Sequence, residues 1–401
     1  MKTVDPSAIP WRRPAGPRDP QQSHRVASSL ELLFDLCFVV AVAYAGAGLH
    51  HAIAENHAGA GIANYLTVFF AIWWAWMNFS WYASAYDNDD GAYRLATLVQ
   101  IAGCLIIAAG IPRAFELRQF DVVFVGYLVM RIGLVYLWLR AARADGVCRT
   151  SCRRYAIGIT AAMFGWSVML FGREWPLSAW WLMAAVELAV PLWAERARQT
   201  PWHPHHIAER YGLFTIIVLG ESVLAATHAV REGVEGHGFS ASLVALIGGG
   251  LVILFSLWWI YFSKPAHRFL TSNRTAIRWG YGHYFIFGSA AAVGAGLAVN
   301  VDHLLGKTAI DTRLAAASLT LPVAVFLLMV WLLQVRPNLQ RHGLSIGFPL
   351  AIAGVLAATL CPWPVPSVGI VLAAFLGIEL WLADRRYREQ AATPSRSHQE
   401  V

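Results

Sequence analysis

The sequence predicts an all-α polytopic membrane protein with about twelve transmembrane helices, arranged as two parallel six-helix repeats. Of its 401 residues, 57% are hydrophobic and only 14% are charged, whereas soluble domains carry roughly 25% charged residues. The mean hydropathy is +0.49. The apolar runs are long and continuous, which fits membrane helices of about 20 residues and excludes the short alternating strands of a membrane barrel.

The chain begins with a polar segment, residues 1–27, that we expect to be a cytoplasmic tail. It contains arginines among several turn-forming prolines, and no small-residue cleavage site follows a short apolar stretch, so it does not read as a cleaved signal peptide. The first half of the membrane domain then occupies residues 28–195. Its six apolar runs predict spans at 28–49, 65–86, 92–112, 121–140, 154–171 and 178–195.

A cytoplasmic linker, residues 196–206, precedes the second half of the membrane domain, residues 207–384. Each apolar run in this half is separated from the next by a short segment that contains Lys, Arg, Pro or Gly. The six predicted spans are 207–229, 242–262, 279–300, 314–335, 344–362 and 367–384. Residues 385–401 are basic and polar, and we expect them to form a second cytoplasmic tail.

The distribution of basic residues orients these spans. Most of the 31 Lys and Arg residues fall in segments that lie on one side of the membrane if the N-terminus is cytoplasmic, which agrees with the positive-inside rule. The outer loops hold only Arg113, Arg118, Arg173, Arg231, Lys307 and Arg313. We therefore expect a multi-pass protein of the bacterial cytoplasmic (inner) membrane with both termini cytoplasmic. The net charge of +7 follows from this topology and does not indicate nucleic-acid binding.

The two predicted halves share weak internal similarity. His50 follows Glu31 in the first helix at the same separation as His228 follows Glu209 in the seventh, and residues 76–80 (WMNFS) resemble residues 259–263 (WIYFS). Six spans per half give both halves the same orientation. Two parallel six-helix halves around a central interface are an architecture that secondary transporters use.

Two acidic residues lie near the start of the first predicted helix. Glu31 and Asp35 are spaced i, i+4, which places both carboxylates on one face of the helix. Carboxylates this close resist ionising together, and this favours capture of a proton. For Glu31 the alternative is an ordinary solvated position at the headgroup level beside Arg25.

Other ionisable residues lie deeper in the predicted spans, where each costs about 2.5–3.5 kcal/mol on insertion scales. Glu221 is some 21 Å along the seventh helix from its start, beside Gly220, which permits close approach of another helix. Arg131 is the only basic residue deep within a span, and it requires a buried carboxylate partner. The candidate partners are Glu187, Glu221, Asp35 and Glu379. A fixed ion pair and a site for a substrate anion both remain open for Arg131.

The remaining polar signals are weaker. Asn78, Gln100 and His283 could line the same polar interior or only join helices by hydrogen bonds. The histidines at 203, 205 and 206 and the cysteines at 148 and 152 match no zinc-ligand spacing, so we predict no metal site. We also expect no cofactor, because the sequence contains no phosphate-binding loop, dinucleotide fingerprint or nucleophile elbow.

Two segments resemble a known family. Residues 31–40 (ELLFDLCFVV) are similar to the opening signature of the bacterial low temperature requirement A (LtrA) proteins, and residues 206–222 (HIAERYGLFTIIVLGES) are similar to their second characteristic stretch. The Trp-rich second helix, which runs into Tyr86-Asp87-Asn88-Asp89, fits as well. Cys37 departs from the aliphatic residue expected there. The similarity extends over roughly residues 25 to 385.

This resemblance implies an integral membrane protein linked to growth in the cold, and it assigns no biochemical activity. It supports the importance of six residues without giving them roles: Glu31, Asp35, Glu209, Arg210, Gly220 and Glu221.

Three classes of function stay open at this point. A secondary transporter of an unknown small molecule or ion accounts for the repeat, the number of spans and the buried acids together, with Asp35 and Glu221 as the expected proton or cation carriers. An intramembrane enzyme acting on a lipid or other apolar substrate would use the same carboxylates as acid and base. A sensor or scaffold would use them only in structural ion pairs. Apart from the lipid bilayer, we identify no partner, and the oligomeric state stays open.

Overall fold

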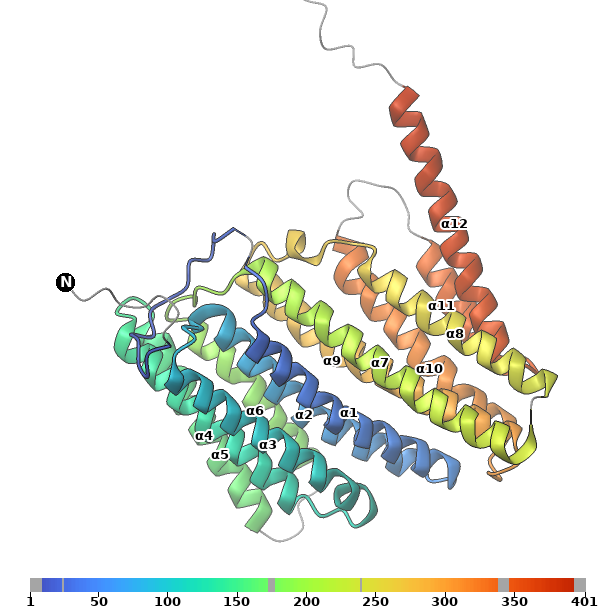
Figure 1. Ribbon diagram of the computed structural model, residues 1–401, viewed down its shortest axis with the longest axis horizontal. Helices are drawn as coiled ribbons and strands as arrows, with labels where there is room; N and C mark the ends of the chain where they lie inside the picture. The colour runs from blue at the N-terminus through green and yellow to red at the C-terminus, as the bar shows by residue number, and fades with distance from the viewer. Residues whose placement is uncertain (1–8, 24, 172–176, 239, 338–345, 393–401) are drawn as a thin grey trace, which may run out of the picture. The chain divides into compact units, whose positions relative to one another are not determined.

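The structure is a computed structural model that describes residues 9–23, 25–171, 177–238, 240–337 and 346–392 (Figure 1). All regular secondary structure in these residues is helical. Two compact units divide the chain. Helices α7 (Pro204–His237) and α9 (Asn273–Leu304) each contribute residues to both units.

The first unit comprises Met1–Glu221 and Ala266–Ala291. Within it, α3 packs against α1 and α4, α4 against α5, and α5 against α6. This unit contains six complete helices: α1 (Ser29–Ala54), α2 (Ala58–Tyr86), α3 (Gly91–Glu116), α4 (Asp121–Ala144), α5 (Arg149–Phe171) and α6 (Leu177–Glu195). It also contains the first part of α7, the 3-10 turn Ala266–Phe269 and the first part of α9.

The second unit comprises Ser222–Pro265 and Ala292–Val401. Within it, α8 packs against α12, and α10 packs against α11. This unit contains the helices α8 (Ala241–Phe262), α10 (Thr312–Val330), α11 (Gly347–Ala357) and α12 (Pro364–Ala392). The π-helical turn Trp331–Val335 follows α10, and the 3-10 turn Ala358–Leu360 follows α11. The remaining parts of α7 and α9 complete the unit.

The helices have the length and composition of membrane spans. Among the described residues, ten helices are long and apolar enough to cross a bilayer, namely α1 to α5, α7, α8, α9, α10 with its π-helical turn, and α12. The protein is therefore an all-α polytopic membrane protein, as the sequence predicts. The predicted spans 178–195 and 344–362 correspond to α6 and α11, which are not among these ten, and residues 344–345 lie outside the described part of the chain.

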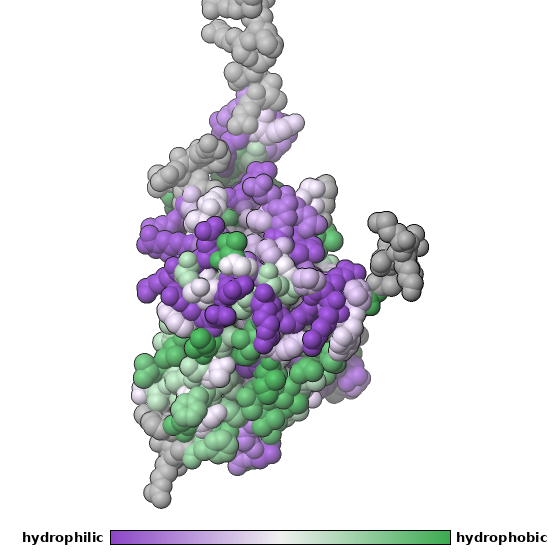
Figure 2. Space-filling view, turned by 90° about the vertical axis from the view of Figure 1, so that its left-hand side faces the viewer, coloured by the Kyte–Doolittle hydropathy of each residue, from purple (hydrophilic) through white to green (hydrophobic). Residues whose placement is uncertain are grey.

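Apolar side chains also cover the outside of the helices. Figure 2 shows a hydrophobic band beneath a cluster of hydrophilic residues on the face that it presents. Several large apolar side chains of the first unit are more than half exposed: Leu36, Ile132, Ile157 and Phe164. Exposed apolar surface of this extent is unfavourable in water and is expected where helices face lipid.

Helix α2 forms much of the core of the first unit. The side chains of Trp73, Trp74 and Trp76 are at most 1% exposed. The rings of Trp73 and Trp74 meet Tyr281 of α9 in edge-to-face contacts, with centroids 6.2 and 5.6 Å apart. The Trp-rich run that marks the second predicted span therefore lies in the buried core of the first unit.

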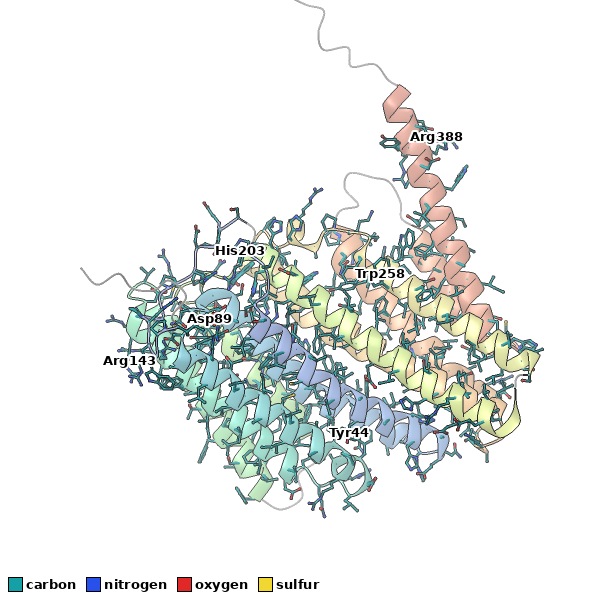
Figure 3. The ribbon with its side chains drawn as sticks, in the orientation of Figure 1. Tyr44, Asp89, Arg143, His203, Trp258 and Arg388 are labelled. Carbon is teal, nitrogen blue, oxygen red and sulfur yellow. The ribbon has the colours of Figure 1, made fainter. Side chains whose placement is uncertain are left out.

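The segment before α1 is bound to the ends of α2 and α3. The backbone N–H of Arg18 donates to the carbonyl of Ala85 (2.9 Å), and the N–H of Gly91 donates to the carbonyl of Pro10 (3.1 Å). The predicted polar tail, from residue 9 onward, is thus hydrogen-bonded to the helix ends. Figure 3 places Asp89, Arg143 and His203 at this same end of the helices of the first unit.

Candidate functional site

The first unit contains a buried cluster of four ionisable side chains, which we call the α1–α7 charge cluster: Glu31 and Asp35 from α1, and His206 and Arg210 from α7. None of them is more than 1% exposed. The guanidinium of Arg210 donates to Glu31 Oε1 (2.7 Å) and to both oxygens of Asp35 (3.0 and 2.5 Å). Nε2 of His206 lies 3.1 Å from Glu31 Oε1.

Helical spacing explains why these side chains meet. The two acids are separated by four residues on α1, and the imidazole and the guanidinium are separated by four residues on α7, so each pair occupies one helix face. The position of Glu31 is further fixed at the first turn of α1. The side chain of Ser28 accepts from the N–H of Glu31, and the N–H of Ser28 donates to Glu31 Oε2 (2.8 Å). This reciprocal capping box orients the carboxylate.

Aromatic residues of α2 and α7 surround the α1–α7 charge cluster. The indole N–H of Trp76 donates to Asp35 Oδ1 (2.7 Å), and its ring stacks on Phe214 with centroids 4.4 Å apart. Cζ of Arg210 lies 5.9 Å from the centroid of the Phe79 ring. These rings keep water away from the charges, and a low local dielectric strengthens the attraction between them.

The charges of the α1–α7 charge cluster do not balance when the imidazole is neutral. Two carboxylates then face one guanidinium within the cluster, and Arg25, a further buried cation, attracts Glu31 from outside it. One proton bound by Glu31 or His206 brings the net charge to zero. Histidine is the side chain best suited to gain and lose a proton near neutral pH.

The segment that precedes α1 closes this end of the first unit. His203 donates through Nε2 to the carbonyl of Gln22 (2.8 Å), and its Nδ1 accepts from the backbone N–H of His206 (3.3 Å). Burial lowers the pKa of His203, which keeps this ring neutral at pH 7. The guanidinium of Arg25 donates to the carbonyl oxygens of Ser84 and Ala83 at the end of α2, the latter at 2.7 Å.

A further acid, Asp87, lies just beyond the end of α2. Its side chain is buried, and burial raises its pKa to about 6, with the nearby negative charge of Glu31 acting in the same direction. Arg18 and Arg25 oppose this shift. Asp87 therefore gains a proton under mildly acidic conditions beside the α1–α7 charge cluster.

A second buried ion pair joins α4 to α6. Arg131 lies 3.4 Å from Glu187, and the two side chains are 2% and 1% exposed. Trp74, Tyr127 and Trp166 also donate to this carboxylate, at 2.8, 3.0 and 3.2 Å. Arg131 also donates to the Tyr127 hydroxyl. The sequence predicts a carboxylate partner for Arg131, and of the four candidates Glu187 lies there.

Comparison with known proteins places the chain in a family. The model of the bacterial low temperature requirement A protein (LtrA) matches residues 26–378, which include both buried ion-pair sites. The chain belongs to the LtrA family. A protein of Rhizobium meliloti (strain 1021), described as uncharacterized, is 25% identical over 388 residues, and the alignment covers 91% of each chain. The resemblance read from residues 31–40 and 206–222 is thus confirmed.

Three other residues singled out in this LtrA chain are Glu221, Glu209 and Asn78. Glu221 is half-buried and eleven residues beyond Arg210, about 16 Å along α7. Glu209 is half-buried and accepts a hydrogen bond from the backbone of Ala27. Asn78 donates to the carbonyl of Trp74 in its own helix (2.7 Å). Glu209 is close enough to interact with the charges of Glu31 and Arg210, whereas Glu221 lies well beyond them along α7.

Two members of the site escape the sequence reasoning. The sequence presents His206 only as a possible metal ligand, and Trp76 only as part of the repeat and of the Trp-rich second helix. The i, i+4 spacing of His206 and Arg210 mirrors that of Glu31 and Asp35, and this pairing of an acidic face with a basic face could have indicated the contact. The indole of Trp76 gives no comparable signal, because tryptophan in an apolar run is usually packing.

Proposed function

We propose that this protein is a proton-coupled secondary transporter of the bacterial inner membrane, with both termini cytoplasmic, and that the α1–α7 charge cluster is its proton-binding site. The observation that carries this proposal is the joint burial of two carboxylates, an imidazole and a guanidinium, none of them more than 1% exposed. Buried ionisable groups in membrane helices are costly and are typical of proton and ion pathways.

The contacts suggest which residues hold the proton. Asp35 accepts N–H bonds from Arg210 and Trp76, which favour its ionised form. Glu31 and His206 lie 3.1 Å apart, and a proton on either one neutralises the cluster. We therefore propose that the proton is shared within the cluster, on Glu31, on His206 or, as the sequence alone suggests, on Asp35, whose complete burial favours its neutral form.

The cluster also connects the two predicted halves, because Glu31 and Asp35 lie in residues 28–195 and Arg210 lies in residues 207–384. If these halves are parallel repeats that move against each other, protonation changes the attraction between their first helices. Glu221 lies farther along α7, and we propose it as a second carboxylate, which a proton reaches from the opposite side of the membrane. Staggered carboxylates of this kind permit access from each side in turn.

The alternative of an intramembrane enzyme is less well supported. An enzyme that uses these carboxylates as acid and base requires them within hydrogen-bond reach of a substrate. Here the oxygens of Asp35 are occupied by Arg210 and Trp76, and the side chains are closed off from lipid and from water. Movement of the helices is needed before any ligand contacts them, which is the behaviour of a transporter.

Uptake into reconstituted vesicles tests the proposal. A panel of candidate substrates is followed with and without an imposed proton gradient, together with an internal pH dye. Glu31→Gln should preserve the fold and abolish gradient-driven uptake, and His206→Gln should reduce it. Glu235→Gln changes an exposed acid of α7 and serves as the matched control. Uptake by Glu31→Gln that equals that of the parent, or uptake that never responds to the gradient, contradicts the proposal.

A further inference from the structure

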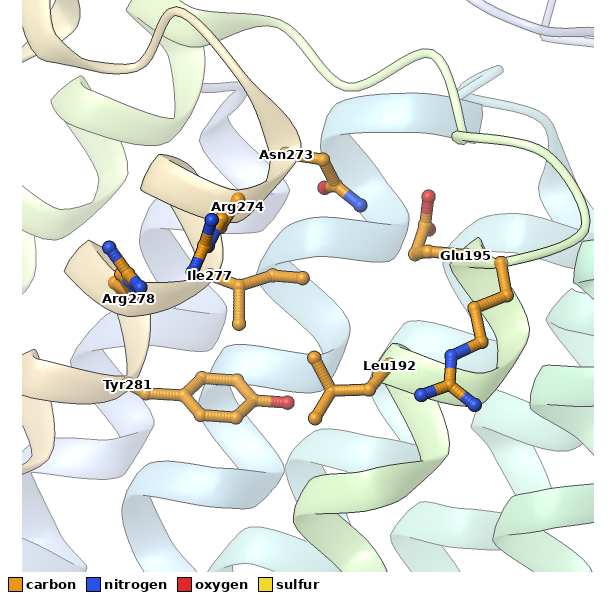
Figure 4. A pocket seen from close by; sticks show the side chains of 8 residues that line it. Leu192, Glu195, Asn273, Arg274, Ile277, Arg278 and Tyr281 are labelled. Atoms are coloured by element: carbon orange, nitrogen blue, oxygen red, sulfur yellow. The ribbon is translucent and has the colours of Figure 1, made fainter.

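A pocket of about 630 Å³ lies between the end of α6 and the first turns of α9, within the first unit (Figure 4). Glu195, Arg196, Asn273 and Arg274 lie at the two helix ends, Leu192, Ile277 and Arg278 lie about one turn deeper, and Tyr281 lies a further turn along α9. The lining residues are Leu192, Glu195, Arg196, Asn273, Arg274, Ile277, Arg278 and Tyr281.

The pocket carries a net positive charge. Arg196, Arg274 and Arg278 are exposed, and none of them forms an ion pair with a carboxylate among the residues that the structure describes. Glu195 is the acid in the lining, and its oxygens already accept from Tyr155 (2.8 Å) and from the hydroxyl and N–H of Thr200 (2.8 and 2.9 Å). The three guanidinium groups are thus available to an anion from outside the chain.

The floor of the pocket is apolar and fixed in place. The hydroxyl of Tyr281 donates to the carbonyl of Leu188 (2.8 Å), and its ring packs edge-to-face on Trp74 with centroids 5.6 Å apart. Leu192 and Ile277 complete this floor. A basic rim above an apolar floor at the ends of two membrane helices has the polarity of a lipid headgroup above its acyl chains.

We propose that this pocket binds the phosphate group of an anionic phospholipid from the cytoplasmic leaflet. The arginines present planar forks that match phosphate oxygens in bidentate geometry. Basic pockets between membrane helices on the cytoplasmic side are suited to anionic lipid headgroups. The apolar floor favours a phospholipid over a free phosphate ester, because only the lipid supplies an apolar group to cover Leu192, Ile277 and Tyr281.

The test measures lipid binding to the full-length protein in detergent by native mass spectrometry, with phosphatidylglycerol and phosphatidylcholine as probes. The parent is compared with the triple variant Arg196→Gln, Arg274→Gln, Arg278→Gln. Each arginine near an anionic lipid surface contributes about fivefold in affinity, so the triple variant should bind phosphatidylglycerol on the order of 100-fold more weakly. Binding of phosphatidylcholine should not change.

The matched control is the triple variant Arg143→Gln, Arg149→Gln, Arg153→Gln, which removes the same charge from exposed arginines on the same predicted side of the membrane. It should retain the parent's affinity for phosphatidylglycerol. Equal weakening in both triple variants indicates general attraction and overturns the proposal, as does an unchanged affinity in the pocket variant. If the pocket triple variant does not fold, Arg274→Gln and Arg278→Gln are measured singly, each with about a fivefold expected loss.

A soluble probe separates the two sources of phosphate. Glycerol phosphate is added to the parent protein with bound phosphatidylglycerol, up to a concentration equal to that of the lipid. At this concentration it should not displace the lipid. Displacement at equimolar amounts overturns the assignment to a lipid and identifies a soluble phosphate ester as the ligand of the three arginines.

Discussion

Among single residues, Arg131 and Arg210 differ in how completely their charge is satisfied. All three guanidinium nitrogens of Arg210 donate to carboxylates. Arg131 reaches Glu187 and Tyr127 through one nitrogen, and its Nε and Nη1 have no hydrogen-bond partner among the described residues. Both are buried cations, and removal of either leaves a carboxylate stranded.

The ion pair of Arg131 and Glu187 gives a stability prediction. Arg131→Met should lower the free energy of unfolding by about 3–5 kcal/mol, because Glu187 is left as an uncompensated buried charge. Adding Glu187→Gln should restore much of this loss, since the amide is neutral and its oxygen still accepts hydrogen bonds. Thermal unfolding in detergent provides the comparison. A single variant that melts like the parent contradicts the structural role of this pair.

Asp87 gives a prediction for pH. Its pKa is about 6 in the folded protein, above the ordinary value of 3.8, so the protonated form is favoured by folding. The resulting stability is present below about pH 4 and is lost as the pH rises through about 6. Asp87→Asn should therefore raise the melting temperature near pH 8 and have little effect near pH 4. Melting curves of parent and variant across this range provide the check, and a pH-independent difference contradicts the shift.

Between elements, the close approach of α3 and α4 depends on glycine. A Cβ atom added at Gly126 would lie 2.5 Å from the carbonyl oxygen of Gly103, which is backbone and cannot move aside. Gly126→Ala should cost about 1–3 kcal/mol through this overpacking. Gly59→Ala in α2 is the control, since nothing lies within 4 Å of its added Cβ. Similar melting temperatures for both variants would show that the helices can separate without cost.

The helices themselves follow from the sequence, because long apolar runs leave a membrane segment few alternatives to helix. The residues at which the helices begin and end are predicted less accurately from the sequence. Helix α2 begins at Ala58 where hydropathy predicts residue 65, and α7 extends from Pro204 to His237 where it predicts 207–229, because a helix continues through interfacial polar residues that hydropathy excludes.

The candidate site was predictable only in part. Glu31, Asp35, Arg131 and Glu187 are visible as charges in apolar runs, and the need for a carboxylate near Arg131 follows from the cost of burying a lone charge. The choice of partner does not follow from sequence, because it depends on which helix faces pack together. For the same reason, the link from Arg210 to α1 and the donation from Trp76 to Asp35 required the structure.

For the whole molecule, the orientation of the chain remains a prediction from the distribution of arginine and lysine. Reporter fusions after Ala58 and after Gly236 should report an external location, and fusions after Arg149 and after Ser272 an internal one. A reversed signal at any of these four positions would remove the basis for twelve spans with two cytoplasmic ends. It would also place the arginine pocket of α6 and α9 on the wrong side for a cytoplasmic lipid.

The central claim is that the α1–α7 charge cluster binds one proton, and direct counting of protons tests it. Purified protein in lipid nanodiscs is titrated from about pH 8 to about pH 5, the range in which histidine and perturbed acids change charge, and the uptake of protons per molecule is measured. Glu31→Gln neutralises the cluster in advance, so this variant should take up one proton fewer than the parent, whereas Glu235→Gln should match the parent. Equal uptake by the parent and Glu31→Gln would contradict the claim and leave these four residues as a fixed structural ion-pair network.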